Sequence, residues 1–110
     1  MAEALKRLGA KVVIAATDTL LYQCPTGKSA VVNITVCNRG ATGRTIRIAH
    51  TIDGAGIIGV ATEDYLLYDA PIQANGSVNI MGITMAQLDS VMVRANHADV
   101  NFVAHGSEIT

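Results

Sequence analysis

The sequence predicts an all-β fold: an antiparallel β-sandwich, jelly-roll-like, with about eight short strands. Stretches of alternating apolar and polar residues recur about every eight to twelve residues, with Gly-, Asn- or Pro-containing turns between them. No segment shows the period of a long helix. Half of the 110 residues are hydrophobic, but the chain has only three Tyr, one Phe and no Trp. We therefore expect an aliphatic core built mainly from stiff Val and Ile side chains.

The most informative segment spans residues 19–38, where two apolar stretches flank Pro25-Thr26-Gly27-Lys28. Pro25 sets φ for a turn, and Gly27 can adopt a positive φ. We predict a tight antiparallel hairpin formed by strands 19–24 and 29–38. Alternate residues of the second strand share one face, namely Ala30, Val32, Ile34 and Val36. The two cysteines, Cys24 and Cys37, are far apart in this hairpin and are expected to be reduced and packed.

The other strands follow from the same alternation. Residues 11–16 form the first strand, and residues 44–52, 65–70, 77–84, 90–96 and 100–106 form the later ones. Pro71 excludes a central position in a sheet. Ala74-Asn75-Gly76 predicts a second hairpin. The glycine-rich loop 53–60 contains apolar residues and is expected to pack against the sandwich.

The N-terminal segment is set apart from the sandwich. Residues 2–8 have the composition of one or two helical turns ending at Gly9, and so short a helix is marginal alone. It is either a frayed end or an arm that orders against a neighbour. We therefore divide the chain into an N-terminal arm, residues 1–9, and one sandwich domain, residues 10–110.

Charge is scarce and unevenly distributed. Charged residues make up 15% of the chain, against about 25% in typical soluble proteins, so we expect part of the surface to meet a partner. Residues 1–44 hold six basic and two acidic residues, and residues 45–110 hold two and seven. The net charge of −1 gives no reason to expect nucleic-acid binding. We expect no membrane span and no signal peptide, hence synthesis in a cytoplasm.

No catalytic or metal-binding pattern emerges. His50, His97 and His105 match no metal-ligand spacing. Gly27-Lys28-Ser29 ends like a phosphate-binding loop, but Tyr22 stands where that motif needs glycine. Asp64 and Asp69 would lie about 16 Å apart along a strand, too far to act as a catalytic pair. We therefore expect neither enzymatic activity nor a cofactor.

Assembly contacts are the remaining candidates for function. The arm and the turns are the segments that would reach a neighbour. Arg39, Arg44 and Arg47 cluster around one turn, where they would be solvated or bind an acidic neighbour such as another subunit. The candidate subunit or capsid contacts are Leu5, Leu8, Arg39, Arg44, Ile57 and Ile58.

Two stretches resemble small structural proteins of tailed bacteriophages. The first is Leu21-Tyr22-Gln23-Cys24-Pro25-Thr26-Gly27-Lys28 with its following strand and Val36-Cys37-Asn38-Arg39. The second is Tyr65-Leu66-Leu67-Tyr68-Asp69-Ala70-Pro71-Ile72 with Ala74-Asn75-Gly76. Together with the closing strands, the resemblance covers roughly residues 10–106. It is carried by the order and spacing of turn motifs and includes no catalytic residue.

The resemblance implies a virion component, made in the host cytoplasm. A head decoration (cement) protein is the first expectation: a homo-oligomer, often a trimer, that binds the major capsid protein or another virion protein. Many weak contacts repeated over a lattice would then give tight binding. The alternatives are a tail or neck component, or a receptor- or carbohydrate-binding module of a tail tip. An enzyme would need a polar pocket joining a histidine to Cys or Asp.

Overall fold

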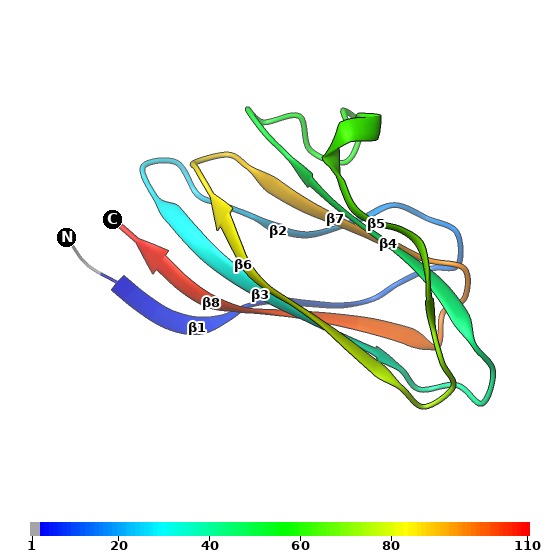
Figure 1. Ribbon diagram of the computed structural model, residues 1–110. Coiled ribbons are helices and arrows are strands. Elements are labelled where there is room, and N and C mark those ends of the chain that lie inside the picture. Colours follow the sequence, from blue (N-terminus) through cyan, green and yellow to red (C-terminus); the bar gives the residue numbers. More distant parts are fainter. Residues whose placement is uncertain (1–2) are drawn as a thin grey trace.

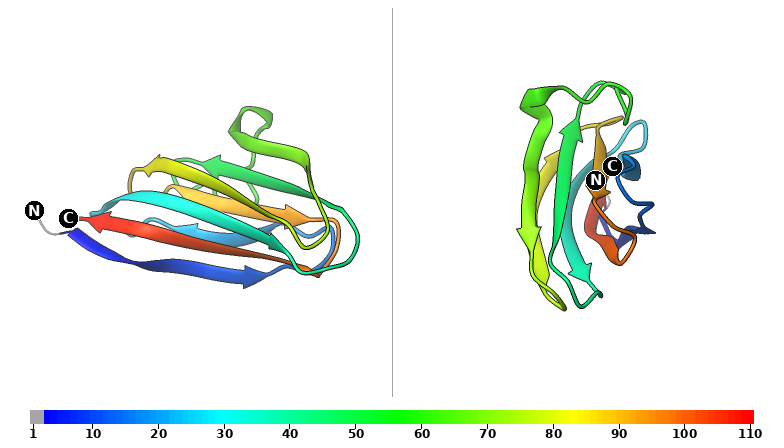
Figure 2. Two further views of the ribbon diagram at one scale, coloured as in Figure 1. Left: turned by 60° about the horizontal axis from the view of Figure 1, so that its bottom comes forward. Right: turned by 90° about the vertical axis from the view of Figure 1, so that its right-hand side faces the viewer.

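Eight strands form two four-stranded antiparallel sheets in a computed structural model that describes residues 3–110 (Figure 1). Sheet A has the order β1 (Glu3–Val12), β8 (Val100–Ile109), β3 (Ser29–Asn38), β6 (Ser77–Met85). Sheet B has the order β2 (Thr19–Gln23), β7 (Ser90–Ala95), β4 (Arg44–Thr51), β5 (Tyr65–Ile72). The two sheets stack into a flattened sandwich of 45 × 27 × 19 Å (Figure 2).

The strand pairing confirms the jelly-roll expectation. β1 pairs with β8, β2 with β7, β3 with β6 and β4 with β5. In this nested pairing the first strand pairs with the last, the second with the seventh, and so on inward, which is the topology of a jelly roll. Further ladders, β3 with β8 and β4 with β7, complete each sheet.

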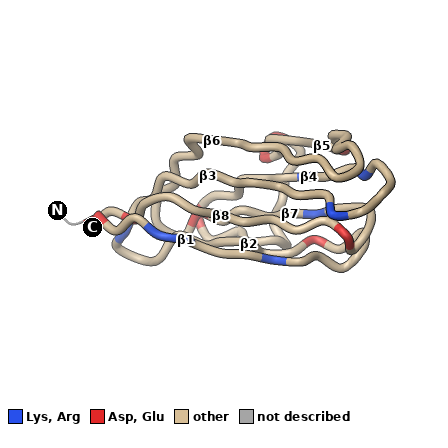
Figure 3. The backbone as a smooth tube through the Cα atoms, turned by 90° about the horizontal axis from the view of Figure 1, so that it is seen from below, with Lys and Arg blue, Asp and Glu red and all other residues tan. Residues whose placement is uncertain are grey.

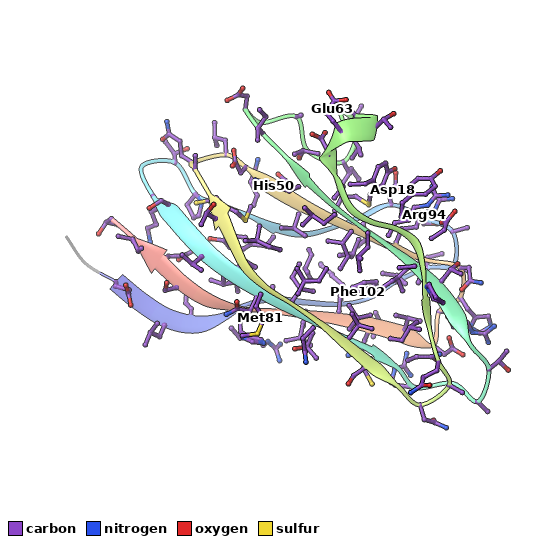
Figure 4. The ribbon with its side chains drawn as sticks, viewed as in Figure 1. Asp18, His50, Glu63, Met81, Arg94 and Phe102 are labelled. Carbon is purple, nitrogen blue, oxygen red and sulfur yellow. The ribbon has the colours of Figure 1, made fainter. Side chains whose placement is uncertain are left out.

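The core lies between the sheets and is aliphatic, as predicted. Side chains of β3 alternate between buried and half-buried positions, with Ala30, Val32, Ile34 and Val36 buried. They pack in one cluster with apolar residues of both sheets, including Ile46, Ile48, Val91, Val93 and Phe102. Among the described residues, Phe102 has the largest side chain that is fully buried (Figure 4).

The predicted hairpins are wrong, although the turns themselves are confirmed. The Lys28 amide donates to the Pro25 carbonyl, and Gly27 has φ +80°. Yet β2 belongs to sheet B and β3 to sheet A, so the turn links the two layers. The turn at Asn75 likewise joins β5 to β6 across the sandwich. Turn residues reverse the chain, but they do not decide whether the returning strand pairs with its predecessor or stacks over it.

The predicted helix over residues 2–8 is also wrong for residues 3–8, and residue 2 lies outside the described residues. These residues begin β1, which pairs with β8 from Glu3 to Val12 with a register shift between Arg7 and Gly9. Pairing with β8 overrides the helical preference of Ala, Glu, Leu and Lys. The strand expected at 11–16 therefore ends at Val12, and residues 13–18 form the connection to β2.

The connection between β4 and β5 lies against the outside of sheet B, where η1 (Thr62–Asp64) contacts β4 (Figure 1). Ile57 and Val60 are half-buried there, but Ile58 is 97% exposed. The prediction that this loop packs down thus holds for part of it. β5 is an edge strand, in agreement with Pro71.

Candidate functional site

The outer surface of sheet A is an open face of the fold, and we call it the sheet A face. Its side chains follow from the registers, because residues paired across an antiparallel ladder point to the same side. The residues opposite the buried row of β3 define it: Glu3, Leu5, Arg7, Ala10 and Val12 of β1; Asn101, Val103, His105, Ser107 and Ile109 of β8; Ser29, Val31, Asn33, Thr35 and Cys37 of β3; Ser77, Asn79, Met81 and Thr84 of β6.

The sheet A face is almost without charge. Among the residues just named, the ionic side chains are Glu3 and Arg7, and both lie on the edge strand β1. Arg39, which follows β3, reaches one end of the face by donating to Asn101 Oδ1. Strands β3 and β6 contain no Asp, Glu, Lys or Arg, and the single one in β8, Glu108, is buried. Figure 3 looks onto this sheet and shows β3, β6 and β8 uncoloured along most of their length. Soluble surfaces normally intersperse charges of both signs, so this face is unusual.

Apolar side chains project from the sheet A face. Leu5, Met81 and Val12 are 78%, 74% and 65% exposed. Met81 points away from the opposite sheet (Figure 4), at a β-bulge where Gly82 has φ +77° and donates its amide hydrogen to Asn33 Oδ1. Met81 and His105 help to line a shallow hollow of about 220 Å³. The face thus carries both projections and a depression.

The outer surface of sheet B has the opposite character. A row of charges crosses this surface, from Asp18, just before β2, to Arg94 of β7, Arg47 of β4 and Asp69 of β5. Arg94 donates to Asp18 at 3.1 Å, and Arg47 binds both carboxylate oxygens of Asp69 at 2.6 and 3.1 Å. The bond from Arg47 holds the pKa of the Asp69 carboxyl below its usual range. Each arginine therefore already has an acidic partner within the chain.

Two tyrosines stand beside this row. Tyr65 and Tyr68 meet edge to face with centroids 4.8 Å apart, and the Arg47 guanidinium lies 4.1 Å from the centre of the Tyr68 ring. Tyr68 is 59% exposed, and the two rings help to line a hollow of about 410 Å³ with Val60 and Thr62. Of the four aromatic residues in the chain, Tyr22 and Phe102 are buried, so only Tyr65 and Tyr68 could contact a sugar.

A buried polar cluster ties strands together at one end of the sandwich. Tyr22 Oη donates to Glu108 Oε2 at 2.6 Å, and Lys6 Nζ lies 2.8 Å from Glu108 Oε1. Lys28 approaches the same oxygen at 3.7 Å. Lys6 and Tyr22 hold the pKa of Glu108 below its usual range, while burial and the bond to Glu108 raise that of Tyr22. The cluster joins β1, β2 and β8 and is structural in character.

The nucleophile and histidine candidates are dispersed. Burial raises the pKa of the Cys24 thiol, which disfavours the reactive thiolate. His50 bonds to Asp89 at 2.9 Å, His97 to Asp99 at 3.2 Å and His105 to Thr35 at 3.4 Å. No group of three or more His, Cys, Asp or Glu suited to a metal occurs within residues 3–110. Both cysteines are free. Over the same range no helix is long and apolar enough to cross a membrane.

The residues nominated as contacts lie in three separate places. Leu5 is exposed on β1, while Leu8 is half-buried against the core. Ile57 and Ile58 lie in the loop on sheet B. Arg39 and Arg44 lie at the far end of the sandwich, where Arg39 binds Asn101 Oδ1 and Arg44 binds both oxygens of Asp99. Arg44 thereby lowers the pKa of the Asp99 carboxyl.

Sequence reasoning missed the sheet A face as a unit. Its residues come from four strands, and the only signal available was the lack of charge in segments 29–38 and 77–85. Once the fold is known, these two segments lie side by side in one sheet. Neither a protein-family model nor a curated protein matches this chain.

Proposed function

We propose that this protein is a structural component of a tailed-phage virion, with a head decoration protein as the leading assignment. It assembles with itself and binds the capsid surface through repeated contacts. The observation that carries the proposal is the exposed sheet A face, whose strands β3 and β6 contain no charged residue, because a surface of this kind favours a protein partner over bulk water. The order of turn motifs shared with small phage structural proteins supports the same reading.

The fold is compatible with this role. Eight-stranded jelly rolls occur in viral capsid and lectin domains, which is an analogy of fold and does not by itself assign function. The two sheets bury one continuous aliphatic core, and the cluster around Glu108 ties the ends of β1 and β8 to β2. A stiff, low-charge module suits repeated attachment, in which many weak contacts add through avidity.

The test is to purify phage particles encoded by the genome that carries this chain, and to quantify the chain in them by mass spectrometry. A decoration protein is expected in amounts comparable to the major capsid protein. A few copies per particle would assign it to the tail or neck instead of the head. Absence from particles that contain all their other structural proteins would overturn the proposal.

A glycan-binding module of a tail tip is the second candidate, favoured by the exposed Tyr68 beside the paired charges of Arg47 and Asp69. Exposed aromatic rings flanked by polar groups suit sugar binding, although here the guanidinium already occupies part of one ring. A glycan array probed with the wild type and with Tyr68→Ala decides. Signals lost in the variant support this candidate, and an array without signals removes it.

A further inference from the structure

We propose that a second copy of this chain packs against the sheet A face about a two-fold axis, so that two sandwiches meet face to face as a dimer. The inference rests on the proposed function, which includes self-assembly, and it adds the surface and the symmetry. Four observations support it: the contrast between the two outer faces, the distribution of charge, the area and the shape.

The two outer faces differ in what already covers them. On sheet B, the connection from β4 to β5 shields Ala49 and Met92, both fully buried although they point outward, and the row from Asp18 to Asp69 satisfies its own charges. On sheet A, no segment of the described chain lies over β3, β6 or β8, and Met81 and His105 remain exposed. The uncovered sheet is therefore A.

The charge distribution favours a copy of the same chain. In a two-fold contact, the same patch of both subunits meets itself, so like charges at its centre would repel. The sheet A face avoids this, since its ionic residues lie at the periphery: Glu3 and Arg7 are on the outermost strand, and Arg39 follows the end of β3. Its polar side chains, chiefly Asn33, Thr35, Asn79 and Asn101, each donate and accept hydrogen bonds. Asn33 Oδ1 already accepts from Gly82 and Asn101 Oδ1 from Arg39, but the amide nitrogens of these two residues can donate to the same residue types on a partner.

The area is sufficient for a specific dimer. Four strands spaced about 4.8 Å apart and ten residues long at about 3.3 Å per residue give a face of about 600 Å². Two such faces bury about 1,200 Å² in total, the lower bound of stable specific interfaces. The shape is also suitable, because an isologous contact needs projections and depressions on the same surface. The face offers both in the Met81 side chain and the hollow beside it.

The first experiment measures the mass of the full chain by sedimentation and light scattering over a range of concentrations. We expect about twice the monomer mass of 11.5 kDa. Thr35→Lys, at the centre of the face, is expected to weaken dimerisation about 100-fold or more, because two lysines then oppose each other across the interface. The matched control is Leu66→Lys, which places a lysine at an exposed position of β5 in sheet B. We expect this variant to remain a dimer.

The second experiment uses a thiol that the face already contains. Cys37 lies half-buried on the sheet A face, whereas Cys24 is fully buried in the core cluster. In the wild type, labelling of Cys37 by a maleimide should slow as protein concentration rises and the face becomes covered. In Thr35→Lys, the rate should be fast and independent of concentration. Circular dichroism verifies that both lysine variants are folded.

Several outcomes overturn the inference. The wild type forms no such dimer if its measured mass stays at 11.5 kDa at all concentrations. The same conclusion follows if the rate of Cys37 labelling does not change with protein concentration. A trimeric mass contradicts the two-fold geometry. If Leu66→Lys dissociates the dimer and Thr35→Lys does not, the interface lies on sheet B and the inference is wrong. A monomer that is abundant in phage particles refutes the dimer and leaves the proposed function standing. If the chain is a dimer but is absent from phage particles, the proposed function is refuted and the dimer stands.

Discussion

Replacing Phe102 with alanine should remove a large part of the stability of this fold. The ring is fully buried in a core cluster that consists mainly of aliphatic side chains. A phenylalanine side chain buries about 150–250 Å², and loss of about 120 Å² at about 25 cal/mol per Å² amounts to about 3 kcal/mol. The cavity adds to this, since the β-branched residues around it have few alternative rotamers. We therefore expect a loss of about 4 kcal/mol, within the 3–5 kcal/mol range of such substitutions.

Urea unfolding followed by far-ultraviolet circular dichroism measures this effect. With a slope of about 2 kcal/mol per molar urea, the midpoint should fall by about 2 M at unchanged slope. Met81→Ala is the matched control, because Met81 is 74% exposed and its loss should change stability by no more than about 0.5 kcal/mol. If Phe102→Ala is too unstable to study, Phe102→Leu should give a smaller decrease. A loss below about 1 kcal/mol for the alanine variant would refute the reasoning that the ring anchors the core.

Three further predictions concern named contacts, each tested by the same urea titration. Tyr22→Phe deletes the hydroxyl that donates to Glu108 and should cost about 1.5–3 kcal/mol, the usual range for a bond to a charged group. The pKa of Glu108 is lowered in the folded state, so its contribution is complete above the unfolded pKa of about 4.3 and is lost as pH falls further. Stability should therefore decline below about pH 4.3, and Glu108→Gln should decline less; equal declines would contradict this assignment. Gly106→Ala should destabilise by about 2 kcal/mol or more, since φ is +155° and a Cβ would overlap the Val31 carbonyl. Gly27→Ala is its milder control, with a positive φ but open space around it.

The sequence predicted the local features well. The alternation in residues 29–38 identified which side chains of β3 are buried, because a period of two allows only one apolar face. Pro25, Gly27 and Asn75 marked true turns, and Pro71 marked an edge strand. These features depend on φ preferences and on side-chain periodicity, which act within a few residues.

Features that depend on distant partners were not predictable. The composition of residues 3–8 favours a helix, but β8 supplies a ladder that a local pattern cannot reveal. Both predicted hairpins failed because β2 and β5 pair with strands of sheet B, whereas β3 and β6, which follow them in the chain, belong to sheet A. The sheet A face escaped notice for the same reason, since its breadth exists only once β1, β8, β3 and β6 are aligned. The paired charges of Arg44 and Arg47, expected to be solvated or to meet an acidic neighbour, also required knowledge of the fold.

The position of β8 has a consequence for synthesis in the cell. This strand lies between β1 and β3 in sheet A, so β1 has no neighbour in its sheet until β8 begins to leave the ribosome. The nascent chain must therefore hold β1 unpaired during most of its translation. Loops that close over such separations form slowly. A chain truncated before β8 would leave two strand edges exposed, which makes it a natural substrate for chaperones and proteases.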